Sequence, residues 1–345
     1  MEGPSHTNNR GRLSVISCDS GRAFATGLAE ALSRIILEAD GEAPAVVRAS
    51  EEVTFANGET KTVIRESIRG DDVYVVQCMD DPLSRRSVND NLMALLTAIN
   101  AVYQSDPDSI TAVIPQFPYS RQDSKRAREP ITARVVAAAL EDVGVRRIIT
   151  LDIHAPAIEG FFRRAVLENL HASNEIVTFL RRTIPLDNLC VVAPDTGRAP
   201  MARLYSRALN CDFAVADKVR DYTAASTIES MRLVGEVAGR QVIIPDDMVA
   251  TGETLLNCCR LVLDKGASGV YVVCSHPFFN GAAVEKLDRG FENGLFKMIV
   301  GTDAVCRGPD FAREHAWYRE VSLTGLFARV IFNINRRQSV STLLD

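Results

Sequence analysis

Short apolar runs rich in β-branched residues alternate along the chain with stretches whose apolar residues recur at helical spacing. Such runs are typical of strands that are buried on both faces of a parallel sheet. The predicted strands are Leu13–Ser17, Val73–Gln77, Ile110–Ile114, Arg147–Leu151, Leu189–Ala193, Phe213–Ala216, Val242–Ile244, Val270–Cys274 and Lys297–Val300.

Each predicted strand is followed by a loop or by a stretch with helical spacing. The predicted helices are Ala23–Leu37, Asn89–Val102, Pro130–Asp142, Asn174–Arg182, Pro200–Leu209, a stretch that begins at Leu255, Ala282–Leu287 and Leu326–Ile334. The alternation of strand and helix occurs twice over. It therefore predicts an α/β fold of two tandem, doubly wound parallel-sheet domains.

No Gly/Ser-rich or Pro-rich linker separates the two halves, and the boundary is expected within Pro156–Ala172. We assign residues 1–12 to a disordered tail, 13–163 to the first domain and 164–345 to the second. The last helix is able to pack back on the first domain. Within the first domain, Thr54–Ile64 alternates between apolar and polar residues and carries Asn57-Gly58, a signal for a β-hairpin turn.

Composition narrows the class of protein. A chain of 345 residues suits about two domains. The net charge of −5 gives no basic footprint for nucleic acid, and no apolar run approaches the ~20 residues of a membrane span. The eight cysteines show no C-x-x-C spacing, which favours free thiols in a reducing compartment. We therefore expect a cytoplasmic protein without nucleic-acid or membrane partners.

The stretch from Arg240 to Arg260 carries the clearest chemistry. A buried-strand run leads to two adjacent carboxylates, Asp246 and Asp247, and then to a small turn that opens a helix. Free N–H groups at a helix start bind anions, and the carboxyl ends of strands are where α/β sheets bind ligands. Thr251 and Thr254 can donate from their hydroxyls. The stretch suits a sugar phosphate, although taken alone it is equally typical of a helix with a threonine cap.

Polar residues follow two strands of the first half. Arg121 and Lys125 lie in the loop after Ile110–Ile114 and can contact phosphate. The same residues are also typical of a loop that is simply exposed to solvent. Asp152 and His154 follow Arg147–Leu151 directly. A carboxylate and an imidazole at a strand end suit a divalent metal or a phosphate, while a lone histidine is more often structural.

In the second half of the chain, two more segments place polar residues directly after a predicted strand. Residues Asp195, Thr196, Gly197 and Arg198 form a turn between a strand and a helix, which suits a second anion or a metal–pyrophosphate. Lys218 and Arg220 precede the flexible-looking stretch 221–227, and a cationic loop there would stabilise charge in phosphoryl transfer. An exposed basic loop is the plain alternative. Together, the segments predict a site for two phosphorylated substrates and a divalent cation.

The chain resembles the ribose-phosphate pyrophosphokinase family, also called phosphoribosyl pyrophosphate synthetases, from about Leu13 to Leu344. The resemblance rests on many short motifs in the same order. They are Phe55–Glu59, Glu66–Gly70, Val88–Met93, Pro118–Gln122, Arg128–Ala133, Asp152–Ala155, Gly160–Phe162, Pro194–Gly197, Asp217–Arg220, Asp246–Met248 and Ser339–Ser341.

The resemblance implies two domains of the type I phosphoribosyltransferase-like fold. It implies transfer of the diphosphoryl group of MgATP to the C1 hydroxyl of ribose 5-phosphate, giving 5-phosphoribosyl diphosphate and AMP. It also implies a homo-oligomer, built from dimers and up to a hexamer in size, in which a neighbouring subunit completes the nucleotide site.

The resemblance also implies roles for the residues of this chain that match the family's site positions. For ATP they are Phe55, Asn57, Glu59, Arg121, Gln122 and Asp123. For ribose 5-phosphate they are Asp246 and Asp247, which bind the hydroxyls, and Ala250, Thr251, Gly252, Glu253 and Thr254, which cradle the phosphate. Asp195, Thr196, Gly197 and Arg198 line the pyrophosphate region, His154 and Asp195 hold Mg²⁺, and Lys218 and Arg220 stabilise the transferring group.

The chain departs from the family pattern in several places. Ala250, Glu253 and Arg198 replace the usual Asp, Gly and Gly, and Glu253 is expected to point away from a bound phosphate. Pro156 and Ala157 replace polar residues of the family's regulatory phosphate site, whereas Arg69, Asn169, Ser339 and Ser341 match that site. We therefore expect weakened or altered activation by phosphate.

Two other functions remain open from the sequence. The chain could be a non-catalytic regulatory subunit of a phosphoribosyl pyrophosphate synthetase. It could also be a phosphoribosyltransferase, which consumes the activated sugar rather than making it.

Overall fold

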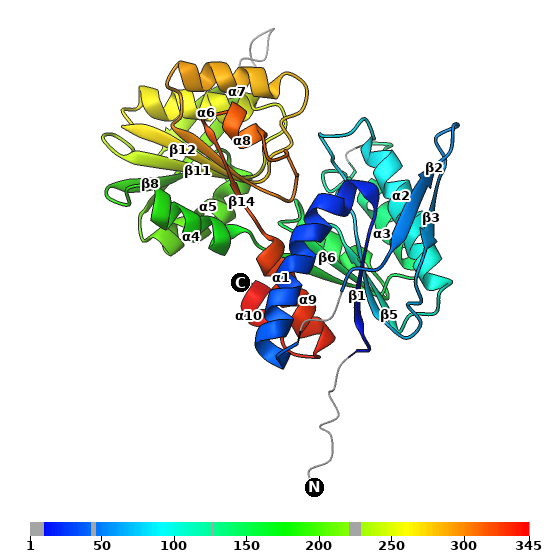
Figure 1. Ribbon diagram of the computed structural model, residues 1–345. Helices are drawn as coiled ribbons and strands as arrows, with labels where there is room; N and C mark the ends of the chain where they lie inside the picture. The colour runs from blue at the N-terminus through cyan, green and yellow to red at the C-terminus, as the bar shows by residue number, and fades with distance from the viewer. Residues whose placement is uncertain (1–9, 43–45, 126, 221–228, 345) are drawn as a thin grey trace. The chain divides into compact units, whose positions relative to one another are not determined.

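The computed structural model describes residues 10–42, 46–125, 127–220 and 229–344 (Figure 1). They form two compact units. The first runs as far as His171 and also includes Ala304–Cys306 and the chain from Ser322; the second comprises Ala172–Asp303 and Arg307–Val321. The first unit thus extends past residue 163, the expected end of the first domain, because Val166–Leu170 pairs with its sheet. None of the described helices is long and apolar enough to cross a bilayer.

The first unit is built on a parallel five-stranded sheet of order β1-β4-β5-β6-β7. A separate antiparallel hairpin, β2–β3, lies between β1 and β4 in the chain. The elements are β1 (Leu13–Ser17), η1 (Asp19–Gly21), α1 (Arg22–Asp40), β2 (Ser50–Thr54), β3 (Thr60–Ile64), β4 (Asp72–Val76), α2 (Val88–Tyr103), β5 (Ser109–Val113), α3 (Thr132–Asp142), β6 (Arg147–Leu151), η2 (Pro156–Phe161), β7 (Val166–Leu170), α9 (Thr324–Asn335) and α10 (Ser341–Leu344).

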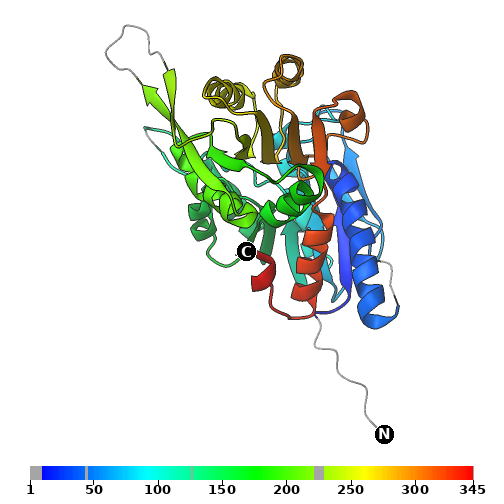
Figure 2. The same ribbon diagram turned by 90° about the vertical axis from the view of Figure 1, so that its left-hand side faces the viewer.

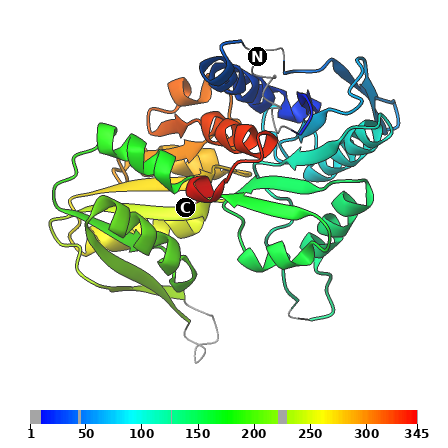
Figure 3. The ribbon, with the colours of Figure 1, turned by 90° about the horizontal axis from the view of Figure 1, so that it is seen from below.

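The last long helix of the chain packs within the first unit. Figure 3 shows α9, in red, beside α1, in blue. Phe24 and Phe327 meet edge to face with their ring centroids 5.2 Å apart, and both side chains are buried. Apolar residues on both helices therefore cover this side of the unit, as the helical spacing in the sequence requires.

Part of the expected disordered tail is held in place. The backbone N–H of Arg10 donates to the carbonyl of Asn335 at 2.9 Å, and Arg12 forms an ion pair with Asp71 at 2.8 Å. Residues 1–9 of the expected tail lie outside the described residues.

The second unit contains a seven-stranded sheet of order β10-β9-β8-β11-β12-β13-β14, in which only β10 runs antiparallel to its neighbour. Helices α6 and α7 lie on one face of this sheet, and α4 and α5 lie on the other (Figure 1). The elements are α4 (Ser173–Thr183), β8 (Leu189–Ala193), η3 (Thr196–Arg198), α5 (Ala199–Leu209), β9 (Asp212–Arg220), β10 (Glu229–Val234), β11 (Gln241–Met248), α6 (Glu253–Asp264), β12 (Gly269–His276), α7 (Ala283–Glu292), β13 (Met298–Thr302), α8 (Phe311–Glu314) and β14 (Tyr318–Val321).

Strand β9 continues past the predicted end at Ala216. It reaches Arg220 because it pairs with β10, which the sequence analysis did not predict (Figure 2). A second difference concerns α3, whose helical residues begin at Thr132, so that Pro130 precedes the first turn instead of lying in it.

Candidate functional site

The order of strands in the second unit defines where a ligand fits. From β8 the chain passes to β9 and β10 on one side, and from β11 it passes to β12, β13 and β14 on the other. Neighbouring strands β8 and β11 are parallel, and the sheet order changes direction between them. Open α/β sheets bind ligands at the carboxyl ends of strands at such a switch point. Asp195 follows β8, and Asp246 and Asp247 end β11, so both predicted segments meet at this point.

The acidic pair is largely withdrawn from solvent. Asp247 is 2% exposed, and its backbone N–H donates to Asp246 Oδ1 at 2.9 Å. Burial raises the pKa of Asp246 well above its ordinary value, and the charge of Asp247 raises it further. Two adjacent buried carboxylates therefore need a cation or hydroxyl donors to satisfy them.

Arg198 supplies that cation. Its Nε lies 3.2 Å from Asp246 Oδ1, and its Nη2 lies 3.0 Å from Asp247 Oδ2. The guanidinium side chain is 18% exposed. In the sequence Arg198 was grouped with the turn after β8, and its backbone lies in that turn. Its side chain instead bridges both carboxylates, because β8 and β11 are adjacent in the sheet.

The turn from Ala250 to Thr254 connects β11 to α6. Gly252 caps the helix with φ of +74°, a left-handed conformation that a side chain disfavours. The carbonyl of Ala250 accepts a hydrogen bond from the N–H of Asn280 at 2.8 Å. This hydrogen bond holds the turn in place, and the turn brings the N-terminus of α6 to the switch point.

Glu253 is exposed and has a basic partner. Its carboxylate forms an ion pair with Lys286 at 2.8 Å and is 62% exposed. The hydrogen bond and charge of Lys286 lower the pKa of Glu253, so it stays ionised on the outer side of α6. The sequence analysis did not identify Lys286 as the partner.

The turn after β8 is a short 3₁₀ segment, Thr196–Arg198. Asp195 caps it, since its Oδ1 accepts from the N–H of Arg198 at 3.0 Å. A β-carbon on Gly197 would lie 3.2 Å from that same Oδ1, so glycine keeps the turn tight.

Polar residues of the first unit follow its strands. Asp152 has φ of +36°, and its Oδ1 lies 2.8 Å from Nδ1 of His171. The sequence analysis grouped Asp152 with His154 and missed His171, which follows β7 and lies beside it only through the β6–β7 pairing. Asn169 Oδ1 accepts from the N–H of Ile153 at 3.0 Å.

The loop after β5 carries the predicted nucleotide residues. Gln122 is tied to α3, because its Oε1 accepts from the Thr132 hydroxyl at 2.5 Å, while its N–H donates to the carbonyl of Tyr119 at 2.8 Å. Arg121 is exposed, and Asp123 Oδ1 lies 3.4 Å from the Ser124 hydroxyl.

The hairpin signal in the sequence is confirmed. Gly58 has φ of +89°, and the N–H of Phe55 donates to the carbonyl of Glu59 at 2.8 Å. Phe55, Asn57 and Glu59 are all exposed at the tip between β2 and β3. Exposed residues of this kind are open to a ligand or to a neighbouring chain.

Strand β9 includes the backbone of the two predicted catalytic cations. Lys218 pairs with Met231 and Arg220 pairs with Glu229 in the antiparallel ladder. The predicted flexible stretch 221–227 lies outside the described residues.

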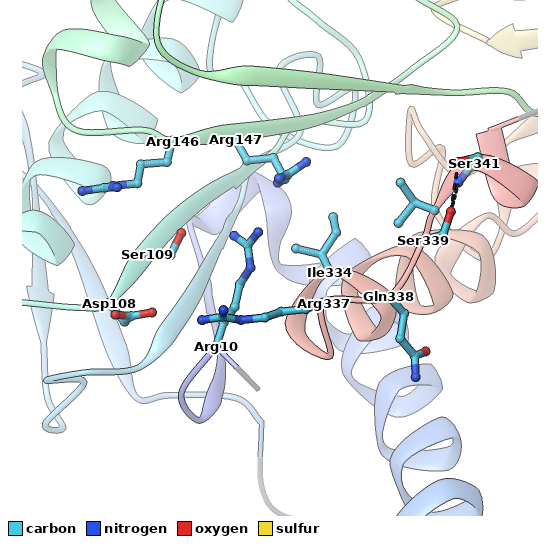
Figure 4. Close-up of a pocket in the computed structure, with 11 residues that line it drawn as sticks. Arg10, Asp108, Ser109, Arg146, Arg147, Ile334, Arg337, Gln338, Ser339 and Ser341 are labelled. Carbon is cyan, nitrogen blue, oxygen red and sulfur yellow. Dashed lines mark hydrogen bonds between the residues drawn. The ribbon is translucent and has the colours of Figure 1, made fainter. Parts of the chain in front are cut away.

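A pocket of about 680 Å³ lies in the first unit, at the amino-terminal ends of β5 and β6. Figure 4 shows the segment that follows α9 closing one side of it. Ser339 and Ser341, which match the family's regulatory site, belong to its lining, and their hydroxyl oxygens lie 2.9 Å apart. The sequence analysis did not single out its arginines, which are Arg10, Arg146, Arg147 and Arg337. Among the described residues of this lining, Asp108 is the only acidic one, so the lining favours an anion.

The two other residues that match the regulatory site, Arg69 and Asn169, lie outside this lining. Arg69 forms an exposed ion pair with Asp106, and Pro156 and Ala157 are exposed in η2. The expected change in phosphate response stays a prediction.

The described residues contain no group of three or more His, Cys, Asp or Glu side chains arranged to hold a metal ion. Mg²⁺ keeps several waters and commonly binds through one or two carboxylates together with substrate phosphates. The few candidate ligands, Asp195 and His154, therefore fit a magnesium ion that binds together with a nucleotide.

Comparison with known proteins supports the same interpretation. Residues 13–144 match the N-terminal domain of ribose phosphate pyrophosphokinase, and residues 165–306 match the phosphoribosyl transferase domain. Ribose-phosphate pyrophosphokinase A of Dictyostelium discoideum is 40% identical over 292 residues, which cover 84% of this chain and 88% of the relative. The chain belongs to the ribose-phosphate pyrophosphokinase family. A ribose-phosphate pyrophosphokinase of Wolinella succinogenes is 38% identical over 290 residues, with the same coverage of both chains.

A solved structure extends the likeness to the fold. The crystal structure of phosphoribosylpyrophosphate synthetase from Mycobacterium smegmatis matches with a TM-score of 0.81 and 28% identity, covering 94% of this chain and 98% of that one. The resemblance, the two parallel-sheet α/β domains and the assignment to an enzyme family are thereby confirmed.

Proposed function

We propose that this chain is a ribose-phosphate diphosphokinase. It transfers the diphosphoryl group of MgATP to the C1 hydroxyl of ribose 5-phosphate and releases 5-phosphoribosyl diphosphate and AMP, for nucleotide biosynthesis. The observation that carries the proposal is the switch point between β8 and β11, which holds a buried acidic pair beside a helix N-terminus. This combination suits the hydroxyls and the phosphate of one sugar phosphate.

The residues that we propose for the sugar phosphate are the acidic pair and the turn that follows it. Asp246 and Asp247 accept hydrogen bonds from the ribose hydroxyls. The backbone N–H groups from Ala250 to Thr254 and the hydroxyls of Thr251 and Thr254 bind the 5-phosphate, and the helix dipole of α6 favours its charge. Because the phosphate contacts are mainly to backbone, the alanine at position 250 is compatible with binding.

The residues that we propose for the nucleotide belong to the first unit. Arg121, Gln122 and Asp123 contact ATP, and Phe55, Asn57 and Glu59 hold the adenine of a neighbouring subunit in a homo-oligomer. The hairpin residues Phe55, Asn57 and Glu59 are exposed, as are Arg121 and Gln122 in the loop after β5, and this exposure supports such contacts.

Charge that develops on the transferring group is stabilised by Lys218 and Arg220, whose backbone lies in β9. Asp195 would give Mg²⁺ a carboxylate oxygen and His154 would hold it directly or through water. Mg²⁺ held there would supply positive charge against the charge of the phosphate oxygens. We further propose that the protein works in the cytoplasm.

The test is an assay of AMP release from ATP by the purified chain. We expect AMP only when ribose 5-phosphate and Mg²⁺ are both present. If the chain forms no AMP alone but alters the rate of a partner synthetase, it is a regulatory subunit. If it consumes 5-phosphoribosyl diphosphate with a free base, it is a phosphoribosyltransferase.

A further inference from the structure

Arg198 links two features that the proposed function assigns to different ligands. Its backbone N–H is held by Asp195, at 3.0 Å from Oδ1, in the turn proposed for the diphosphoryl group. Its guanidinium lies on the acidic pair proposed for the ribose hydroxyls, at 3.2 Å from Asp246 and 3.0 Å from Asp247. One side chain therefore reaches from the turn after β8 to the end of β11.

The guanidinium competes with the sugar. It takes up one oxygen of each carboxylate, and Asp246 Oδ1 also accepts from the backbone N–H of Asp247. Ionised carboxylates only accept hydrogen bonds, so a ribose hydroxyl must share or replace the donors already present. While Arg198 bridges the pair, ribose binds against an existing, largely buried ion pair.

A diphosphate gives the guanidinium another partner. Arginine binds phosphate oxygens through the same two-donor geometry that it uses for carboxylates. A diphosphoryl group in the turn from Asp195 to Arg198 would therefore draw the guanidinium off the acidic pair. The charge of that pair would then be available to the ribose hydroxyls.

We propose that Arg198 couples the two ligands: it holds Asp246 and Asp247 until a diphosphate binds, and it thereby makes ribose 5-phosphate binding depend on the diphosphate. The inference rests on the proposed function, which supplies both ligands. Because coupling between two ligands is reciprocal, ribose 5-phosphate tightens diphosphate binding by the same factor. Arg198 is in this view a positioning residue that decides the order of binding.

Calorimetric titration tests this without turnover. Ribose 5-phosphate is titrated into the full chain with and without inorganic pyrophosphate, at constant ionic strength set with sulfate, because the arginine-lined pocket also attracts anions. We expect pyrophosphate to tighten ribose 5-phosphate binding by about tenfold, within the usual range for coupled sites. In Arg198→Gln, binding should be tight without pyrophosphate and change by less than about twofold when it is added.

Two further variants make the result specific. Arg207→Gln removes an exposed arginine from α5, the helix that follows Arg198, and should behave like the unmodified chain. Arg198→Lys keeps the charge but cannot bridge both carboxylates and should retain only part of the coupling. Near-ultraviolet circular dichroism checks that each variant is folded.

Equal coupling in Arg198→Gln and the unmodified chain overturns the proposal. So does weaker ribose 5-phosphate binding by Arg198→Gln in the absence of pyrophosphate, because Arg198 would then support the site instead of competing for it. If AMP release is normal and the coupling is unchanged, only the role of Arg198 fails. If the unmodified chain binds no ribose 5-phosphate, both proposals fail.

Discussion

Replacing Gly252 with alanine perturbs the turn between β11 and α6 without removing a polar or charged group. The residue has φ of +74°, and left-handed backbone costs a non-glycine residue about 1–2 kcal/mol. A β-carbon there would lie 3.5 Å from Leu287 Cδ2, which is ordinary contact, so no clash adds to the cost. The smaller conformational freedom of alanine in the unfolded chain offsets roughly 0.4–1 kcal/mol of this. We expect a net loss of about 1 kcal/mol.

Thermal unfolding measures this loss. For a unit of this size, about 1 kcal/mol lowers the midpoint by roughly 2–4 °C. Gly239→Ala is the matched control, since Gly239 has φ of +71° and nothing within 4 Å of the added carbon. Both variants should lose similar stability, but only Gly252→Ala should raise the KM for ribose 5-phosphate, because its turn carries the phosphate N–H groups.

Two results would refute this reasoning. If Gly252→Ala is as stable as the unmodified chain, the turn does not need a left-handed residue. If both variants raise the KM equally, the effect belongs to general destabilisation and the turn has no special role in binding the phosphate.

Four other predictions follow from the described residues. Lys218→Ala should lower turnover by orders of magnitude with little change in ATP affinity, because its charge acts mainly in the transition state; unchanged turnover in steady-state kinetics would remove it from the mechanism. Asp247→Asn should raise the KM for ribose 5-phosphate more than that for ATP, and equal changes would contradict the ribose assignment. Activity measured with and without inorganic phosphate should show weak or altered activation, whereas strict phosphate dependence would mean that Pro156 and Ala157 do not weaken the regulatory site. Glu141 is buried, which raises its pKa, but N–H groups of residues 163, 164 and 165 donate to its Oε1 at 2.6–2.9 Å and lower the pKa overall. This stabilisation is present above the unfolded pKa of ~4.3 and is lost as the pH falls through the lower folded value. Denaturant unfolding between pH 3 and 7 should therefore show a smaller loss of stability in acid for Glu141→Gln than for the unmodified chain.

The buried strands of the sheets could be predicted from local sequence. Strands β1, β6 and β8 begin and end at the predicted residues, because each is a short, mostly apolar run whose residues are almost all buried. Strand β7 was missed because Glu168 and Asn169 interrupt its apolar residues. Glu168 pairs with Arg147 on β6, a contact that a single strand does not reveal.

The edge strands of the second unit, β10 and β14, were likewise not predicted from local sequence. Strand β14 has four residues, two of them exposed, and β10 is half polar. Such short, solvent-facing strands form because a neighbour offers unpaired backbone groups, and only the assembled sheet supplies that neighbour.

Only part of the candidate site could be predicted from local sequence. The acidic pair and the turn after it are contiguous in sequence, so strand, carboxylates, glycine and helix could be recognised together. The ion pairs of Arg198 join residues almost fifty positions apart, and they depend on the order in which β8 and β11 enter the sheet. The contact between Asp152 and His171 likewise depends on the pairing of β6 with β7.

The central claim is that the chain moves a diphosphoryl group and not a single phosphoryl group. The direct measurement uses ATP that carries a radioactive label in its β-phosphate, incubated with the chain, Mg²⁺ and ribose 5-phosphate, followed by separation of the products. The account predicts that the label appears in the sugar product, in equal amount to the AMP released. Label that remains in ADP, or in unreacted ATP under every condition, would contradict it.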